Sequence, residues 1–346
     1  MPLPPTSDPA GPLVGFGWSE RWATRAAAAT GDREGVRPGR VVRHDGLTVT
    51  VATAEGVAPL PVLAAVEPRP VVGDWVLADD AVCATLERTS LLRRRDPMRD
   101  AEQPIAANVD IVVIVCGLDR PVKPGRLQRA TALARDAGAD PLVALTKADL
   151  AADPDGARDE VEAGNPGVEV VVTASATGRG IAALQEACRD RTVVLIGESG
   201  AGKSSLANAL AGVDVAAVGA VRAGDAKGRH TTTSRQLHVL PSGGVLIDTP
   251  GIRAVGLWGD VDAIAGAFED VEGLAGACRF SDCAHTGEPG CAVEAAVVAG
   301  HLARARLDAW HALQDEAAEA EERAEARAWR AGEGRRPTPA RRPRRG

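Results

Sequence analysis

Gly197-Glu198-Ser199-Gly200-Ala201-Gly202-Lys203-Ser204-Ser205 is the stretch that decides the fold class of this chain. It fits the pattern GxxxxGK[ST], and it lies between an apolar run at Val193 to Ile196 and a segment with helical spacing. A strand, a glycine turn and a helix N-terminus in this order form a phosphate-binding loop, because the glycines let successive backbone N–H groups face an anion. Lys203 would hold the β- and γ-phosphates, and the Ser204 hydroxyl would ligate Mg²⁺. The alternative is a glycine turn that binds nothing.

The composition is that of a globular protein with an excess of acidic residues. The 346 residues are 45% hydrophobic and carry a formal net charge of -7, which argues against a protein that coats nucleic acid indiscriminately. Basic runs at Arg93 to Arg95 and in the tail from Arg335 to Gly346 could still meet a phosphate backbone. Met1 to Pro12 lacks the features of a signal peptide, and the longest apolar runs have strand length. We therefore expect a cytoplasmic protein that does not contact a membrane.

The chain has two successive parts that differ in their pattern of expected strands and helices. Short strands separated by turn residues begin near Gly39 and predict a small barrel, for which an OB-fold and a β-extension packed on its neighbour are the two interpretations. From Ile111 onward, apolar strand-length runs alternate with helical segments, which is typical of a doubly wound α/β domain with a mostly parallel sheet. The phosphate-binding loop belongs to this second part.

Thr146-Lys147-Ala148-Asp149 follows one of these strands and matches the [NT]KxD guanine motif of GTPases. Guanine presents its N1–H and its N2 amine side by side, and the Asp149 carboxylate can accept both hydrogen bonds, whereas adenine offers no such pair. Lys147 would lay its aliphatic stem over the base. Ser175-Ala176 follows a later strand and fits the second guanine element, in which the Ala176 N–H would meet the base O6. Both motifs therefore predict a guanine nucleotide, GTP or GDP.

The switch elements lie after the phosphate-binding loop. Asp248-Thr249-Pro250-Gly251 follows an apolar strand; Asp248 would support Mg²⁺ through water, and the Gly251 N–H would sense the γ-phosphate. Gly228 to Thr233 contains Thr232 and Thr233, one of which is the expected second Mg²⁺-linked residue, with Thr232 taken as the ligand. In Ras-like GTPases these elements come first and the guanine motifs follow, so the order in this chain is circularly permuted.

A cluster of soft ligands lies further along the chain. Cys278, Cys283, His285 and Cys291 give the pattern CxxxxCxHxxxxxC within fourteen residues. Three thiolates and one imidazole suit a closed tetrahedral site for one structural Zn²⁺, with no open position for chemistry. Reduced surface cysteines are the alternative.

With these motifs, the chain resembles the circularly permuted GTPases of the RsgA or YjeQ family, over about Gly39 to Leu313. Further points of resemblance are Gly73-Asp74-Trp75-Val76 and Ala107-Asn108-Val109-Asp110; Thr146 stands where many members have Asn. The resemblance implies a protein that binds the small (30S) ribosomal subunit during its late maturation; contact with the rRNA of the subunit and a monomeric state are further expectations. It also implies an N-terminal β-barrel or OB-fold (39–98), a circularly permuted P-loop GTPase domain (99–258) and a C-terminal α-helical zinc-binding domain (259–314). An N-terminal extension, partly disordered (1–38), and a charged C-terminal extension (315–346) depart from the family pattern.

The catalytic group is inferred separately from the nucleotide motifs. Ile252 stands where Ras-like enzymes keep a water-orienting glutamine, so intrinsic hydrolysis should be slow and the docked subunit should stimulate it. His230 is the candidate catalytic residue within the chain, together with Lys203, Thr232 and Thr233. The alternative is that His230 is a loop histidine whose hydrogen bonds are satisfied and which has no catalytic role. Rival functions are a P-loop ATPase or kinase with a structural zinc module, and an RNA-binding scaffold gated by nucleotide.

Overall fold

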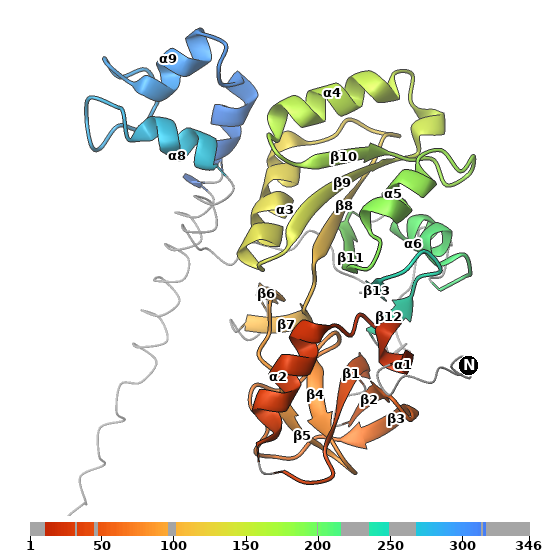
Figure 1. Ribbon diagram of the computed structural model, residues 1–346. Helices are drawn as coiled ribbons and strands as arrows, with labels where there is room; N and C mark the ends of the chain where they lie inside the picture. Colours follow the sequence, from red (N-terminus) through yellow and green to blue (C-terminus); the bar gives the residue numbers. More distant parts are fainter. Residues whose placement is uncertain are drawn as a thin grey trace, which may run out of the picture. The chain divides into compact units, whose positions relative to one another are not determined.

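The computed structural model describes residues 11–31, 33–44, 48–95, 102–198, 200–215, 235–248, 268–312 and 314–315. The chain forms two compact units, residues 1–257 and residues 258–346. Figure 1 traces both units along the chain.

A mostly parallel sheet forms the centre of the first unit. Its strands follow the order β10-β9-β8-β11-β13-β12, and only β12 runs antiparallel to its neighbour β13. The strands are β8 (Ile111–Gly117), β9 (Asp140–Thr146), β10 (Glu169–Val172), β11 (Thr192–Gly197), β12 (Gln236–Val239) and β13 (Val245–Asp248).

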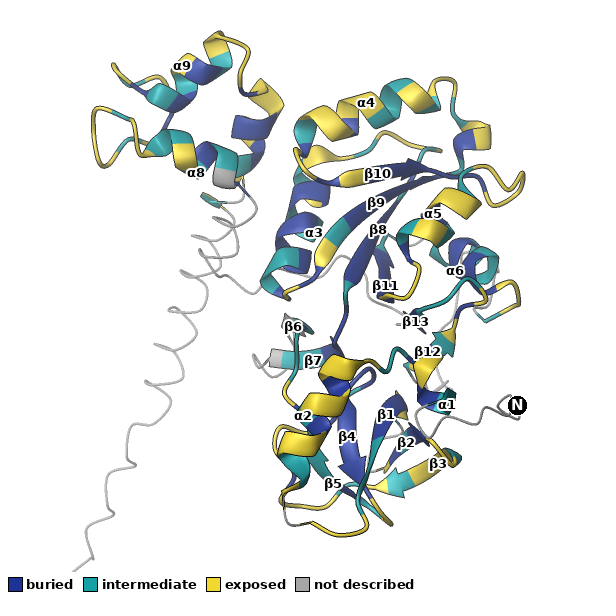
Figure 2. Ribbon diagram, in the orientation of Figure 1, coloured by how far each residue is buried: buried dark blue, intermediate teal, exposed yellow. Residues whose placement is uncertain are grey.

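Helices cover both faces of this sheet. Leu127 of α3 (Pro124–Asp136) and Val161 of α4 (Pro154–Gly164) belong to the apolar core on one face. Leu184 of α5 (Ile181–Ala187) and Leu206 of α6 (Lys203–Ala211) belong to the core on the other. Strands covered on both faces must be apolar throughout, which explains the uninterrupted hydrophobic runs of β8 and β11 and their burial in Figure 2. The predicted doubly wound α/β fold is confirmed.

Five of the described antiparallel strands that precede the parallel sheet are paired into one group. They are β1 (Arg37–His44), β2 (Thr48–Thr53), β3 (Gly56–Pro61), β4 (Trp75–Ala78) and β5 (Val82–Thr85). β1 pairs with both β2 and β4. A bridge between Val62, which directly follows β3, and Val82 of β5 joins the two outer strands of this group. Buried valines, including Val41 and Val51, form a small core of their own. This arrangement agrees with a small β-barrel; its assignment as an OB-fold stays a prediction.

Two helices near the N-terminus and a hairpin also belong to the described part of the first unit. α1 (Gly11–Val14) precedes α2 (Glu20–Thr30), and the centroid of the Trp22 ring on α2 lies 5.7 Å from that of Trp75 on β4. β6 (Leu91–Arg95) and β7 (Glu102–Ala107) pair antiparallel. The domain boundary predicted between residues 98 and 99 therefore falls inside this hairpin.

The barrel strands and the parallel sheet are hydrogen-bonded to each other. Arg43 of β1 pairs with Gln236 of β12, so one sheet path runs from β10 to β3. At the same junction the buried Arg40 donates from Nη2 to the Thr192 hydroxyl at 2.8 Å and from Nε to the carbonyl of Gly73 at 3.3 Å. Burial lowers the pKa of Arg40 to about 10, which still leaves it charged at neutral pH. Thr192 begins β11, whose other end enters the phosphate-binding loop.

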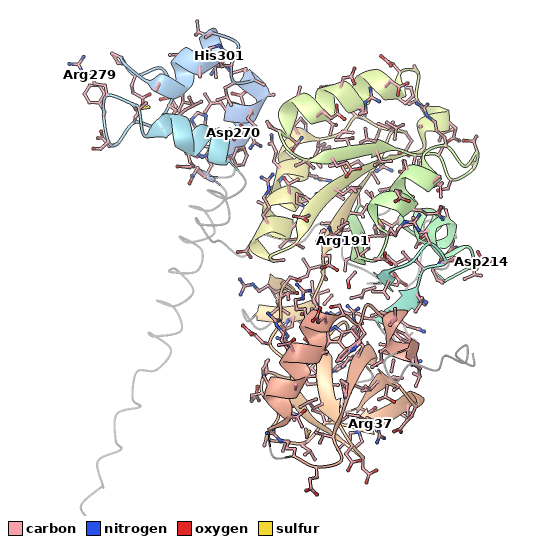
Figure 3. The ribbon with its side chains drawn as sticks, viewed as in Figure 1. Arg37, Arg191, Asp214, Asp270, Arg279 and His301 are labelled. Atoms are coloured by element: carbon pink, nitrogen blue, oxygen red, sulfur yellow. The ribbon has the colours of Figure 1, made fainter. Side chains whose placement is uncertain are left out.

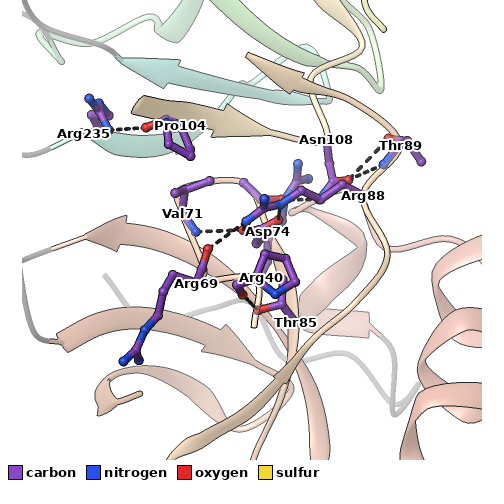
Figure 4. A network of polar contacts seen from close by, with 12 residues as sticks. Arg40, Arg69, Val71, Asp74, Thr85, Arg88, Thr89, Pro104, Asn108 and Arg235 are labelled. Atoms are coloured by element: carbon purple, nitrogen blue, oxygen red, sulfur yellow. Dashed lines mark hydrogen bonds and ion pairs between the residues drawn. The ribbon is translucent and has the colours of Figure 1, made fainter. Parts of the chain in front are cut away.

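The two short motifs that the sequence analysis singled out meet at this junction (Figure 4). The Asp74 carboxylate accepts hydrogen bonds from Arg88 at 2.9 and 2.8 Å and from the Val71 N–H at 2.7 Å. Burial raises the pKa of Asp74, and the bonds from Arg88 oppose that shift. Asn108 has a φ of 55°, and its side-chain amide donates to the Gly73 carbonyl at 3.1 Å. The motifs therefore have a structural role in joining the barrel to the α/β domain.

Gly73 is the tightest point of this junction. Its φ is +94°, and an added Cβ would lie 2.2 Å from the Ala107 carbonyl oxygen and 2.9 Å from Ile247 Cδ1. We expect Gly73→Ala to lower the free energy of unfolding by about 2–5 kcal/mol, because backbone strain and overpacking add. Gly56→Ala is the matched control, since Gly56 also has a positive φ but a Cβ there meets nothing within 4 Å. Equal losses for both variants in urea denaturation would contradict the expected clash.

The described residues of the second unit, 268–312 and 314–315, are mainly helical. It contains α8 (Glu269–Ala275), α9 (Ala292–Val298) and a further helix at residues 304–312. The buried Arg306 pairs with the Asp270 carboxylate at 3.0 and 2.8 Å and lies over the Phe268 ring at 4.1 Å (Figure 3 labels Asp270). These contacts hold the helix at residues 304–312 against α8.

Candidate nucleotide-binding site and metal centre

The predicted nucleotide motifs lie at one edge of the parallel sheet. The phosphate-binding loop follows β11, the guanine loop follows β9, Ser175-Ala176 follows β10, and Asp248 ends β13. Because these four strands are parallel, their carboxyl ends meet at the same edge, which is where α/β sheets bind ligands. Motifs that are permuted in the sequence are thus brought together in space.

The phosphate-binding loop closes tightly against its neighbours. Gly197 and Gly202 have φ values of +149° and +94°, and a Cβ on Gly197 would lie 2.3 Å from the Val115 carbonyl oxygen. The Lys203 ammonium donates to the carbonyl oxygens of Gly197 at 2.8 Å and of Glu198 at 2.6 Å. Burial lowers the pKa of Lys203, and phosphate oxygens within reach would raise it again. Lys203, Ser204 and Ser205 form the first turn of α6, whereas Ser199 lies outside the described residues.

The guanine loop is fastened to the phosphate-binding loop by Thr146. Its buried hydroxyl donates to the Ala201 carbonyl and lies 3.3 Å from the Cys116 carbonyl. Thr146, which stands where many members of the family have Asn, therefore anchors the loop. Asp149 follows in a short 3-10 helix, η1 (Ala148–Leu150), and its side chain is exposed. An exposed carboxylate at this edge is free of the protein core and can meet a base.

The second guanine element lies beside the first. The Ala148 N–H donates to the Thr173 carbonyl at 3.1 Å, and the Thr173 N–H donates to the Leu145 carbonyl at 2.7 Å. Ser175 and Ala176 follow in a turn and are exposed. The backbone bonds thus fix the two guanine loops against each other.

The switch residues are described only in part. Asp248 is half-buried and pairs with Gln236 across β13 and β12. Gly251, His230, Thr232 and Thr233 lie outside the described residues, so their roles stay predictions.

A group of charged residues after β8 was not predicted from the sequence. Asp119 and Arg120 follow the end of this strand, and Arg126 lies in the first turn of α3. Arg126 is ion-paired with Glu198 of the phosphate-binding loop, and Arg120 approaches the same carboxylate to 3.8 Å. One signal in the sequence could have indicated these charged residues: they follow a strand whose carboxyl end lies at the ligand-binding edge of the sheet.

The predicted zinc ligands come together in the second unit. The Sγ atoms of Cys278, Cys283 and Cys291 and a ring nitrogen of His285 all lie within 4.8 Å of one another. His285 Nδ1 lies 3.6 Å from Cys278 Sγ and 3.5 Å from Cys291 Sγ. A tetrahedral ion with Zn–S bonds of about 2.3 Å separates its ligands by roughly 3.5–3.8 Å. The four side chains therefore fit a metal ion, as the sequence predicted.

Backbone hydrogen bonds support this centre. The N–H groups of Ala292 and Glu294 each donate to a cysteine sulfur at 3.3 Å, which stabilises thiolates. The Glu288 carboxylate accepts the N–H groups of Ala284 and Thr286, both at 2.8 Å, and backbone hydrogen bonds, its own first, lower the pKa of Glu288 to about 2. The loop between Cys283 and Cys291 is thus ordered by its own carboxylate.

Within the described part of the chain, no helix has both the length and the apolar character needed to cross a membrane.

Comparison with known proteins agrees with this site. The RsgA GTPase family model matches residues 85–258. "Small ribosomal subunit biogenesis GTPase RsgA" of Streptomyces avermitilis is 45% identical over 315 residues, which cover 87% of this chain and 85% of that protein. The protein of the same name from Streptomyces coelicolor is 44% identical, covering 88% of this chain and 86% of that protein.

Two solved structures share the fold. YjeQ from Thermotoga maritima has a TM-score of 0.60 and 27% identity, covering 80% of this chain and 96% of that one. YloQ, described as a circularly permuted GTPase, has a TM-score of 0.61, covers 85% of this chain and 98% of that one, and at 23% identity shows the fold alone. With guanine motifs that precede the phosphate-binding loop and relatives that match over most of its length, this chain belongs to the RsgA GTPase family.

Proposed function

We propose that this protein hydrolyses GTP and acts in the late maturation of the small ribosomal subunit, which stimulates the hydrolysis. The names of the relatives at 45% and 44% identity support the process. The single observation that carries the nucleotide assignment is the hydrogen bond from Thr146 to Ala201, which fastens the guanine loop to the phosphate-binding loop. One ligand that contains both a guanine base and phosphates fits the two loops.

The proposed roles follow the chemistry of the side chains. Asp149 accepts the N1–H and N2 amine of guanine, with Ser175 and the Ala176 N–H at the base O6, while Lys203 binds the β- and γ-phosphates. Mg²⁺, when bound, neutralises charge that develops on the phosphates, and Ser204, Thr232 and, through water, Asp248 would hold it. The other residues proposed to contact the phosphates or the base are Thr146, Lys147, Gly197, Glu198, Ser199, Gly200, Ala201, Gly202, Ser205 and Gly251.

The remaining parts of the proposal concern structure and partners. Zn²⁺ is the metal that three cysteines and one histidine favour, and it would cross-link the second unit without taking part in the reaction. We propose a cytoplasmic monomer that binds the rRNA of the small subunit, with GTP or GDP as its nucleotide. His230, beside Thr232 and Thr233, is proposed to complete the hydrolytic site when the subunit is bound.

GTP turnover by the purified protein is expected to be slow and to rise at least roughly tenfold with small subunits, since a partner that completes a GTPase site contributes up to about 10³–10⁵. The assay compares the protein alone, with small subunits and with large subunits, and runs ATP in parallel. Lys203→Ala is the control, because it removes the phosphate-binding ammonium and should abolish turnover in every arm. Turnover that small subunits leave unchanged, or a preference for ATP, would contradict the proposal, and the latter would favour the ATPase or kinase interpretation.

A further inference from the structure

The side chain of Lys147 is held by a residue outside the guanine motif. Gly117, the last residue of β8, pairs with Thr146 across β8 and β9, which places the loop after β8 beside the guanine loop. From this loop Asp119 Oδ2 lies 2.8 Å from Lys147 Nζ. Because the acceptor belongs to the protein, it can hold the ammonium whether or not a nucleotide is bound.

Asp119 is shared between two cations. Arg120 Nη2 lies 3.4 Å from the same carboxylate oxygen, and the hydrogen bond from Lys147, followed by that from Arg120, lowers the pKa of Asp119. Arg120 also approaches Glu198 of the phosphate-binding loop to 3.8 Å. A chain of alternating charges, Lys147, Asp119, Arg120 and Glu198, thus connects the guanine loop to the phosphate-binding loop.

A lysine side chain needs an anionic partner at its ammonium if its aliphatic stem is to form an ordered surface for the guanine base. The lysine ammonium is strongly hydrated and sits on a flexible stem. If the stem becomes ordered only when the nucleotide binds, the lost conformational entropy reduces the free energy of binding, whereas a stem that is already ordered avoids this cost. The backbone of Lys147 is already fixed in the left-handed region with a φ of 60°. Contact at Nζ fixes the other end of the side chain.

We propose that Asp119 is a positioning residue for guanine nucleotide recognition, which holds the Lys147 stem as a preformed surface for the base. The inference rests on the proposed function and deepens it. The ion pair itself adds little to folding, because the Lys147 and Asp119 side chains remain 27% and 28% exposed and such pairs are solvent-screened. The effect of Asp119 should therefore appear in nucleotide binding and leave stability nearly unchanged.

The test is a double-mutant cycle read out with a fluorescent N-methylanthraniloyl derivative of GDP. Asp119→Asn removes the charge at constant size and is expected to weaken GDP binding about three- to tenfold, with KM for GTP raised and kcat unchanged, because binding of the ground and transition states is lost equally. Lys147→Met keeps an apolar stem without the ammonium. In that background Asp119→Asn should have no further effect, since its partner is gone.

Asp159→Asn is the matched control, because the exposed Asp159 carboxylate pairs with Arg158 of the same helix, α4, at 2.9 Å and outside the nucleotide motifs, so its loss should leave GDP affinity unchanged. The positioning role would be overturned if Asp119→Asn left GDP affinity intact, or if it lowered GDP affinity equally in the Lys147→Met background. In both cases the wild type would still prefer guanine nucleotides, so the proposed function would stand. A wild type that binds ADP in preference to GDP would overturn the proposed function, and this inference with it.

Discussion

Asp149→Asn is expected to lower the affinity for GDP and GTP by about 100- to 10,000-fold and to raise the affinity for xanthine nucleotides. The carboxylate accepts two charge-assisted hydrogen bonds from guanine, each worth about 1.5–3 kcal/mol. Asparagine turns an N–H donor toward the guanine amine, whereas xanthine carries a carbonyl oxygen at that position and can accept it. Dissociation constants for GDP, XDP and ADP measure the change.

The exposed position of Asp149 makes this comparison clean, because its replacement disturbs no core packing. Asp159→Asn serves as the control; Asp159 is also an exposed carboxylate, paired with Arg158 on α4, and its replacement should change none of the three constants. If Asp149→Asn weakened all three nucleotides alike with no gain for XDP, Asp149 would not be the residue that recognises guanine.

Loss of the metal is expected to unfold the second unit. Its described helices are short, and Cys291 and His285 are among its buried residues, so a metal cross-link at these side chains would supply much of its stability. Chelation, or Cys291→Ser, should remove one Zn²⁺ per chain and several kcal/mol of stability, since metal binding to such sites contributes about 10–16 kcal/mol in small zinc peptides. Metal analysis and circular dichroism before and after chelation follow both changes.

The expected loss is confined to the second unit. GDP binding, which depends on residues of the first unit, should survive chelation. Cys83→Ser is the control, because Cys83 lies on β5 with its sulfur 3.3 Å from the Leu77 carbonyl and should leave the zinc content unchanged. A structural zinc site would be excluded if the protein were purified without zinc. It would also be excluded if chelation altered neither the circular dichroism nor the thermal unfolding of the protein.

Contacts that depend on short spacing could be predicted from the sequence. The phosphate-binding loop is a local turn between a strand and a helix, and the four metal ligands lie within fourteen residues, so residue type and spacing suffice to indicate both. The guanine motifs could be placed at strand ends because buried parallel strands are uninterrupted apolar runs. The catalytic residue could not be determined in this way, since His230 has no local pattern that separates a catalytic from a structural histidine.

The fold class, the nucleotide motifs in their permuted order and the candidate metal ligands could thus be predicted from the sequence, because each depends on local spacing and hydrophobic pattern. The folded structure was needed to show that Arg40 reaches Thr192, 152 residues away, that Asp119 holds Lys147, and that β1 pairs with β12. These contacts depend on the order and register of the strands. Neither is encoded in local spacing, since the same apolar run can pair with several neighbours until the packing of the whole sheet selects one.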